Sequence, residues 1–281
     1  MTKKDVLAFV EAGGAAQTVA PAAPAPAGAV LPPPPAATTT QPDAPTYAAG
    51  ETTARVAMSV MRKKIAEHMI ESRRTSAHVH SVFEVDLTRV VQLRQKYKQA
   101  YLERHGAKLT YMAFFIKAAC DALCAWPIVN SSLDGEHIVY RKDLNIGIAV
   151  ALEWGLLVPV IRNADGLSIA ELCSRVADLA ERARIKKLNP EEVHGGTFTI
   201  TNPGNFGGLY GLPIINQPQV AILGIGGIKK RPVVIAGDAI AIRSMMYVSM
   251  SYDHRVVDGA VADQFLARVQ HTLENFDESL L

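Results

Sequence analysis

The densest cluster of side chains able to perform acid–base chemistry is the segment SMSYDHRVVDGA, residues 249–260. It ends a predicted strand of alternating apolar residues, which delivers Asp253, His254 and Arg255 into a turn. The sheet fixes the backbone of a histidine at such a junction while its ring faces outward, as a general base requires. Asp258 lies four residues later, at a predicted helix start where a carboxylate is favoured. The alternative is a surface ion-pair cluster of Asp253, Arg255 and Asp258, with His254 incidental.

A second candidate is the segment GGTFTITNPGNFGGLYG, residues 195–211. Thr197, Thr199 and Thr201 alternate, so their hydroxyls share one face of a predicted strand, which then ends at Asn202. A hydroxyl on the last residue of a strand can donate a hydrogen bond to a developing oxyanion. Threonine is also common in strands, and the glycines could serve only as turns, so spacing alone leaves both interpretations open.

Other polar patterns favour structure over chemistry. The glycine-rich segment 224–232 matches neither a dinucleotide fingerprint nor a P-loop. His78 and His80 lie two residues apart on one predicted strand, but no further ligand completes a set, so no metal is expected. Cys120 and Cys124 lie on an apolar helix and are predicted to pack in the core.

The elements that must position these residues alternate between helices and strands. Apolar periodicity and capping signals predict helices from residue 59, over 88–105, over 111–126, over 168–187 and over 260–275. Strands are predicted near 78–87, 136–141, 145–151, 157–162, 196–201, 219–225, 230–236 and 240–253. The fold class is therefore α/β, or α+β, with one domain and no internal repeat.

The first 53 residues differ in composition from the rest. Residues 1–13 predict one short amphipathic helix, and nine of the 16 prolines lie between Pro21 and Pro45. Such a segment buries too little apolar surface to offset its ordering entropy, so residues 14–53 are predicted to be a flexible Ala/Pro-rich linker. A linker with so little before it suggests a fragment of a longer chain.

Composition excludes several classes of protein. The 281 residues carry 29 basic and 27 acidic groups, without the basic excess of a nucleic-acid binder. We find no uninterrupted apolar window long enough for a transmembrane helix, and no signal peptide. Three cysteines cannot form a disulfide framework, so a reducing, prokaryote-like cytoplasm is the expected compartment.

The segment SYDHRVVDG resembles the His-x-x-x-Asp-Gly signature of dihydrolipoamide acyltransferases, the core components of 2-oxo acid dehydrogenase complexes. Chloramphenicol acetyltransferase shares this signature more loosely. The blocks LTYMAFFIKAACDAL, GLLVPVIRNADGLSI and PIINQPQVAILGIG also resemble the family, in family order. The resemblance implies a chloramphenicol acetyltransferase-like catalytic domain over residues 54–281, with a mixed central sheet flanked by helices.

The N-terminal segment is similar to a second module of these proteins. Residues 1–13 resemble the last helix of the peripheral-subunit-binding domain, and residues 14–53 resemble the linkers between family domains. No lipoyl domain is seen in the sequence. The resemblance therefore implies a lipoyl group carried on a domain absent from this chain.

The resemblance also implies a reaction, in which S-acyl-dihydrolipoyl-lysine and coenzyme A, as substrate, exchange a thioester. His254 would take the proton of the CoA thiol, and Thr201 would stabilise the tetrahedral oxyanion. Asp258 would support the turn by pairing with an arginine. Asn202 is a lesser candidate for cofactor binding.

Family members form trimers in which the histidine and the Ser/Thr come from adjacent subunits, and the trimers build a 24-mer or a 60-mer. The implied partners of this chain are therefore its own copies, a 2-oxo acid decarboxylase and dihydrolipoamide dehydrogenase. The motifs favour a succinyl group slightly over acetyl or branched-chain groups. A non-catalytic scaffold and a stand-alone small-molecule acyltransferase are the alternatives from other classes.

Overall fold

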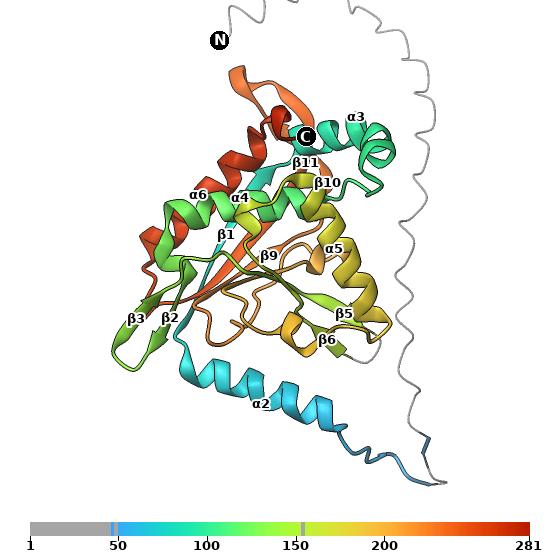
Figure 1. The fold of residues 1–281 in the computed structure, drawn as a ribbon, viewed down its shortest axis with the longest axis vertical. Coiled ribbons are helices and arrows are strands. Elements are labelled where there is room, and N and C mark those ends of the chain that lie inside the picture. Colours follow the sequence, from blue (N-terminus) through green and yellow to red (C-terminus); the bar gives the residue numbers. More distant parts are fainter. Residues whose placement is uncertain (1–45, 48–49, 153–154) are drawn as a thin grey trace, which may run out of the picture. The chain divides into compact units, whose positions relative to one another are not determined.

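The computed structural model describes residues 46–47, 50–152 and 155–281 (Figure 1). The predicted helix at 1–13 and most of the predicted linker at 14–53 lie outside the described residues. All the helices and strands discussed below belong to one compact unit, Thr39–Leu281. Within the described part, no helix is both long enough and apolar enough to cross a bilayer.

A mixed seven-stranded sheet forms the centre of this unit, in the order β1-β11-β9-β8-β4-β7, with β10 added beside β11. Its strands are β1 (His78–Asp86), β4 (Ile146–Ile148), β7 (Val160–Ile161), β8 (Phe198–Thr201), β9 (Ala221–Ile225), β10 (Lys229–Val234) and β11 (Ile240–Asp253). The pairs β8–β9 and β4–β8 are parallel, and the other pairs of this sheet are antiparallel. Two small antiparallel sheets pair β2 (Ser131–Asp134) with β3 (His137–Tyr140), and β5 (Val150–Leu152) with β6 (Gly155–Leu157).

The α-helices of the described residues are α2 (Val60–Thr75), α3 (Thr88–His105), α4 (Tyr111–Ala125), α5 (Ile169–Arg184) and α6 (Gly259–Glu274). Local chemistry explains two of their starts. The Ser59 hydroxyl accepts the Arg62 N–H at the start of α2, and Ser168 and Glu171 form a capping box at the start of α5.

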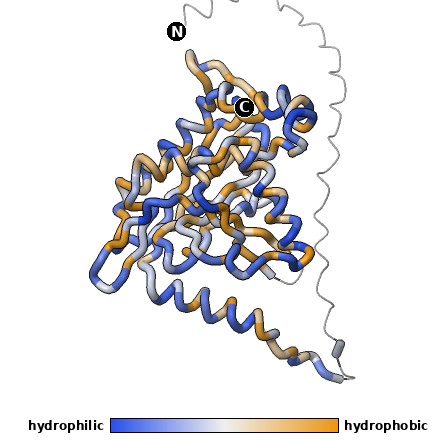
Figure 2. Tube along the Cα trace, viewed as in Figure 1, coloured by the Kyte–Doolittle hydropathy of each residue, from blue (hydrophilic) through white to orange (hydrophobic). Residues whose placement is uncertain are grey.

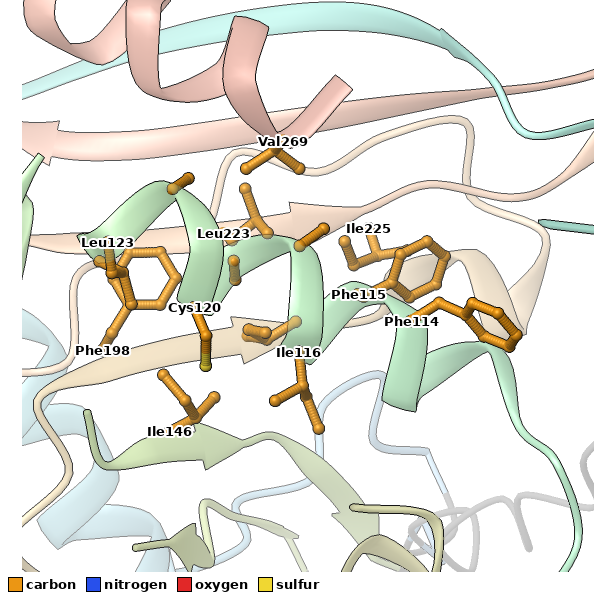
Figure 3. Close-up of a cluster of buried hydrophobic side chains, with 14 of the residues drawn as sticks. Phe114, Phe115, Ile116, Cys120, Leu123, Ile146, Phe198, Leu223, Ile225 and Val269 are labelled. Carbon is orange, nitrogen blue, oxygen red and sulfur yellow. The ribbon is translucent and has the colours of Figure 1, made fainter. Parts of the chain in front are cut away.

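The core lies between the sheet and the helices α4 and α6 (Figure 3). Phe115 of α4 lies beside Ile225 of β9, and Val269 of α6 lies next to Leu223 of the same strand. Each of these side chains is at most 1% exposed. Full burial of one such side chain stabilises the fold by about 1.5–3 kcal/mol. This packing holds the central strands, and thereby the residues at their ends, in fixed positions.

The predicted fold class is confirmed, and most predicted elements exist. Cys120 is buried as expected, but the prediction for Cys124 was wrong because this residue is exposed. The last turn of α4 lines an open pocket between α4 and α6, so Cys124 faces that pocket instead of the core.

Candidate functional site

Pairing between β1 and β11 positions His254. Asp253, the last residue of β11, lies opposite His78, the first residue of β1. The His254 N–H then donates a 2.9 Å hydrogen bond to the carbonyl of Ala77, just before β1. The side chain of His254 is exposed, and its ring centroid lies 6.0 Å from that of Tyr252. The imidazole therefore stands on a fixed backbone and is open to a substrate.

The carboxylate beside His254 is buried and paired. Asp253 is only 1% exposed, and one of its oxygens lies 2.6 Å from a guanidinium nitrogen of Arg255. Burial opposes the ionised form, but hydrogen bonds from Arg255 outweigh this effect and lower the pKa of Asp253. The surface-cluster alternative expected Asp253, Arg255 and Asp258 together, but the ion pair joins only Asp253 and Arg255, and the Asp253 carboxylate is buried.

Asp258 lies on the surface at the start of α6. Asp258 is exposed and occupies the N-cap position of α6, where its side chain makes no capping hydrogen bond. Within the described residues it forms no ion pair, whereas Arg255 directs its guanidinium to Asp253 instead. The expected ion pair between Asp258 and an arginine does not form among the described residues of one copy, and it stays a prediction for the assembly.

The three threonines of the second candidate segment have different environments. The Thr197 hydroxyl accepts the Asn145 N–H at 3.1 Å, and the Thr199 hydroxyl donates to Gln219 at 2.7 Å. Thr201 is half-buried at the end of β8, and its hydroxyl has no hydrogen-bond partner among the residues that the structure describes. Its hydroxyl is therefore available to a ligand, whereas the other two serve the fold.

The loop after Thr201 is held by close backbone packing. A methyl group at Gly204 would lie 2.4 Å from the carbonyl carbon of Gly226, so only glycine fits there. The side-chain amide of Asn202 donates to Asn205 at 3.3 Å. The Asn202 side-chain oxygen is buried without a partner in the described part of the chain. Asn202 thus presents one unpaired acceptor next to Thr201, and its role in cofactor binding stays a prediction.

A single chain does not bring His254 and Thr201 together. Thr201 lies opposite Gly224 of β9, and Gly224 lies opposite Ser249 of β11. His254 follows Ser249 by five residues. Since a strand rises roughly 3.3 Å per residue, His254 lies about 16 Å from Thr201 along the strand direction. The two residues are also separated across the sheet, because β9 lies between β8 and β11. Within one chain the two side chains cannot contact the same reacting group.

Ring nitrogens of His78 and His80 take part in hydrogen bonds that connect neighbouring segments. The Nδ1 of His78 bonds to the Ser76 carbonyl at 3.0 Å, and its Nε2 accepts the Ile215 N–H at 3.1 Å. The Nδ1 of His80 lies 2.8 Å from the Ser251 hydroxyl. Burial, with the nearby His78 and Arg73, lowers the pKa of His80. No group of three or more potential metal ligands occurs in the described ranges.

Sequence comparison relates this chain to known proteins. The family model for the 2-oxoacid dehydrogenase acyltransferase catalytic domain matches residues 50–281. The succinyltransferase component of the 2-oxoglutarate dehydrogenase complex from Rickettsia typhi is 43% identical over 231 residues, 82% of this chain and 58% of that protein. The lipoamide acyltransferase component of the branched-chain α-keto acid dehydrogenase complex from Bacillus subtilis is 40% identical, over 99% of this chain and 65% of that protein. The chain thus spans less than two thirds of either relative.

Solved structures agree with this placement. A structure of the Azotobacter vinelandii dihydrolipoamide acetyltransferase, solved to study one serine, one histidine and one asparagine in its catalytic mechanism, has a TM-score of 0.78 and 37% identity. The comparison covers 86% of this chain and 100% of that one. The cubic core of a pyruvate dehydrogenase multienzyme complex also has a TM-score of 0.78, with 36% identity and the same coverage. The chain therefore belongs to the 2-oxoacid dehydrogenase acyltransferase family, and residues 50–281 match its catalytic domain.

Proposed function

We propose that this chain transfers an acyl group between S-acyl-dihydrolipoyl-lysine and coenzyme A, as the core of a 2-oxo acid dehydrogenase complex. The observation that carries the proposal is the exposed imidazole of His254 on a backbone that the sheet fixes. Family membership supports the reaction class, since residues 50–281 match an acyltransferase catalytic domain.

The chemistry assigns His254 to proton transfer. A thiol is only a few per cent ionised at neutral pH, so CoA needs a base. The imidazole takes the thiol proton, and the CoA sulfur attacks the thioester carbonyl. When the tetrahedral intermediate collapses, the carbon–sulfur bond to the dihydrolipoyl group breaks, and His254 returns the proton to the leaving sulfur. A positioned base of this kind contributes roughly 10²–10⁴ in rate.

Thr201 is assigned to the oxyanion, from a second copy of the chain. Its hydroxyl has no partner among the described residues, and one such donor contributes about 3–4 kcal/mol to transition-state stabilisation. The strand register separates Thr201 from His254 within one chain, which is the arrangement that a site shared by two copies requires. Asn202 and Asp258 are supporting residues beside these two groups.

The proposed assembly is a homotrimer that builds a 24-mer or a 60-mer, with the decarboxylase and dihydrolipoamide dehydrogenase as partners. The Azotobacter relative supports the site, because its study concerns a serine, a histidine and an asparagine, the last two spaced as His254 and Asp258 are here. The cubic core of the pyruvate dehydrogenase relative supports the assembly.

Succinyl is the proposed acyl group, because the Rickettsia relative is a succinyltransferase component. A branched-chain acyl group is the second candidate, because the match to the Bacillus branched-chain component covers 99% of this chain. Acetyl remains the third.

The test is a panel of succinyl-, acetyl- and isobutyryl-CoA with dihydrolipoamide as acceptor. The proposal predicts the highest kcat/KM with succinyl-CoA. A higher value with either other thioester would reject the succinyl assignment and keep the reaction class. If no thioester is consumed by an assembled protein, the chain is a non-catalytic scaffold.

A further inference from the structure

A buried carboxylate lies directly before His254, at the end of β11. Asp253 is 1% exposed, although aspartate is rarely buried unless it is paired. The proposed reaction gives it no task, since none of its hydrogen bonds involves the His254 ring. The contacts of this carboxylate therefore need their own explanation.

Both oxygens of Asp253 accept several hydrogen bonds. Oδ1 accepts the Ala77 N–H at 3.2 Å and the Arg255 N–H at 3.1 Å. The Nε of Arg255 lies 3.0 Å from Oδ1, and its Nη2 lies 2.6 Å from Oδ2. The guanidinium thus grips the carboxylate as a two-pronged fork, the strong and directional form of this interaction.

These and neighbouring hydrogen bonds fix the backbone on both sides of His254. Ala77 is held at both ends, because its N–H donates to Asp253 and its carbonyl accepts the His254 N–H at 2.9 Å. The carbonyl of Asp253 accepts the N–H groups of Val256 and Val257, at 3.0 and 2.9 Å. Hydrogen bonds to Ala77 therefore hold the turn against the start of β1, and hydrogen bonds from Val256 and Val257 to Asp253 close the turn. His254 lies between these two sets of bonds.

We propose that Asp253 and Arg255 form a positioning clamp for His254, which sets the direction of the imidazole by fixing the turn that carries it. The clamp rests on the proposed function, because it is meant to align the base with the CoA thiol. A misplacement of about 1 Å can cost an enzyme roughly 100-fold in rate, so a fixed turn has catalytic value. Neither clamp residue touches substrate, and both act through the backbone.

Two substitutions test the clamp. Arg255→Lys keeps the charge but loses the fork, and Asp253→Asn removes the charge from a site of the same shape. We expect kcat to fall about 10-fold in Arg255→Lys and about 100-fold in Asp253→Asn, with KM for CoA changed less than about twofold. Wild-type kcat in Arg255→Lys, or a change confined to KM, would overturn the proposal.

A second fork provides the matched control. Arg268 of α6 grips Asp121 of α4 through two hydrogen bonds, at 2.7 and 3.0 Å, outside the proposed site. Arg268→Lys makes the same chemical change and is expected to leave kcat within about twofold of wild type. An equal loss of kcat in Arg268→Lys would show a general loss of packing and reject a specific clamp.

A double-mutant cycle separates positioning from a general structural role. In a His254→Ala background, Asp253→Asn should cause no further loss of the residual rate, because nothing is left to position. A further 10-fold loss there would contradict the clamp. Arg255→Lys is the deciding variant if Asp253→Asn does not assemble. If wild-type protein itself shows no CoA-dependent transfer, the proposed function fails, whereas an active wild type with an equally active Arg255→Lys rejects the clamp alone.

Discussion

At the level of single residues, a side chain at the end of a strand is free for chemistry, whereas one within the strand is taken up by structural hydrogen bonds. Thr199 and Thr201 are two residues apart on the same face of β8, yet only Thr199 finds a partner, at Gln219. The side chain of Thr201 lies where the strand stops and where neighbouring strands no longer supply acceptors. The same position at the end of β11 exposes His254.

Substitution of Thr201 tests its assignment to the oxyanion. Thr201→Ala should lower kcat about 100-fold and leave KM for CoA within about twofold, because the lost hydrogen bond forms only in the transition state. Thr201→Ser keeps the hydroxyl and should retain most of the activity. Steady-state kinetics with varied CoA measure both constants, and a rise in KM alone would make Thr201 a binding residue.

Their place at strand ends made His254 and Thr201 candidates, and the family resemblance assigned their roles, but neither predicted the clamp. The sequence shows Asp253 and Arg255 only as part of an Asp-His-Arg triplet, and the same triplet could lie on a turn exposed to solvent. What distinguishes the clamp is the burial of Asp253 and the approach of Ala77 from another strand. Both depend on long-range pairing of β1 with β11, which local periodicity does not contain.

At the level of elements, one arginine ties the end of α5 to the 3₁₀ turn that follows it. Arg182 contacts Asp178 at 2.7 Å and Glu192 at 2.6 Å. Hydrogen bonds from Arg182 and from the Asn189 backbone lower the pKa of Glu192 to about 2. The carboxylate is more acidic in the folded chain, so it stabilises the fold above its ordinary pKa, and this contribution is lost as pH falls toward 2.

Glu192→Gln tests this connection through stability rather than activity. At pH 7 the variant should lower the apparent Tm by about 2–4 °C, because the amide cannot pair as an ion with Arg182. The difference from wild type should shrink as pH falls below about 4.5, because the carboxylate then protonates in the unfolded chain while it stays ionised in the folded one, whose pKa is about 2. Thermal unfolding followed by circular dichroism at several pH values measures both effects.

The neighbouring Glu191→Gln removes the same charge and is the control for this experiment. Its side chain makes no ion pair within the part of the chain described here, so its Tm should stay near wild type. Equal shifts in both variants, or a Glu192→Gln shift that does not depend on pH, would contradict the connection.

Long elements were predicted better than short ones. The helix over 88–105 and the strand over 240–253 have the predicted bounds, because each carries its own periodic pattern and end signals. Residues 145–162 instead divide into four short strands, β4 to β7, two in the main sheet and two in a separate one. The strand β2 was missed, because SSLD has no alternating apolar pattern and becomes a strand only by pairing with β3.

At the level of the whole molecule, the hairpin of β10 and β11 carries exposed apolar residues, and much of its trace has apolar colours in Figure 2. Pro232 lies opposite Ile242, and Val234 lies opposite Ile240, so the four residues share one face. Ile240 and Ile242 are 76% and 72% exposed. Apolar residues gathered on one surface are typical of a protein interface, and the proposed multimeric core supplies a second copy to cover this face.

Charges on this face should weaken the assembly. We expect the double substitution Ile240→Lys and Ile242→Lys to lower the particle mass in mass photometry, because two lysines cannot be buried unpaired. Ile185→Lys, at a 53% exposed position after α5, is the control and should leave the mass unchanged. An unchanged mass in the double variant would show that the hairpin is not an interface.

Sequence motifs alone identified the family, but no pattern along the chain shows how far apart its catalytic candidates lie. That separation follows from the register of β8, β9 and β11: β8 and β11 run in opposite directions on either side of β9, so their C-terminal ends lie at opposite ends of the strands. Under the proposed function, the central consequence is that two copies must meet to complete one site, with His254 from one copy and Thr201 from the other.

Mixing two inactive variants tests this consequence most directly. His254→Ala and Thr201→Ala are co-expressed with different affinity tags, and particles that carry both tags are assayed for CoA-dependent acyl transfer to dihydrolipoamide. In randomly mixed oligomers, about one quarter of the shared sites receive both intact side chains, so activity should return to about one quarter of wild type. If the mixed particles are no more active than the better single variant, His254 and Thr201 do not form a site between copies.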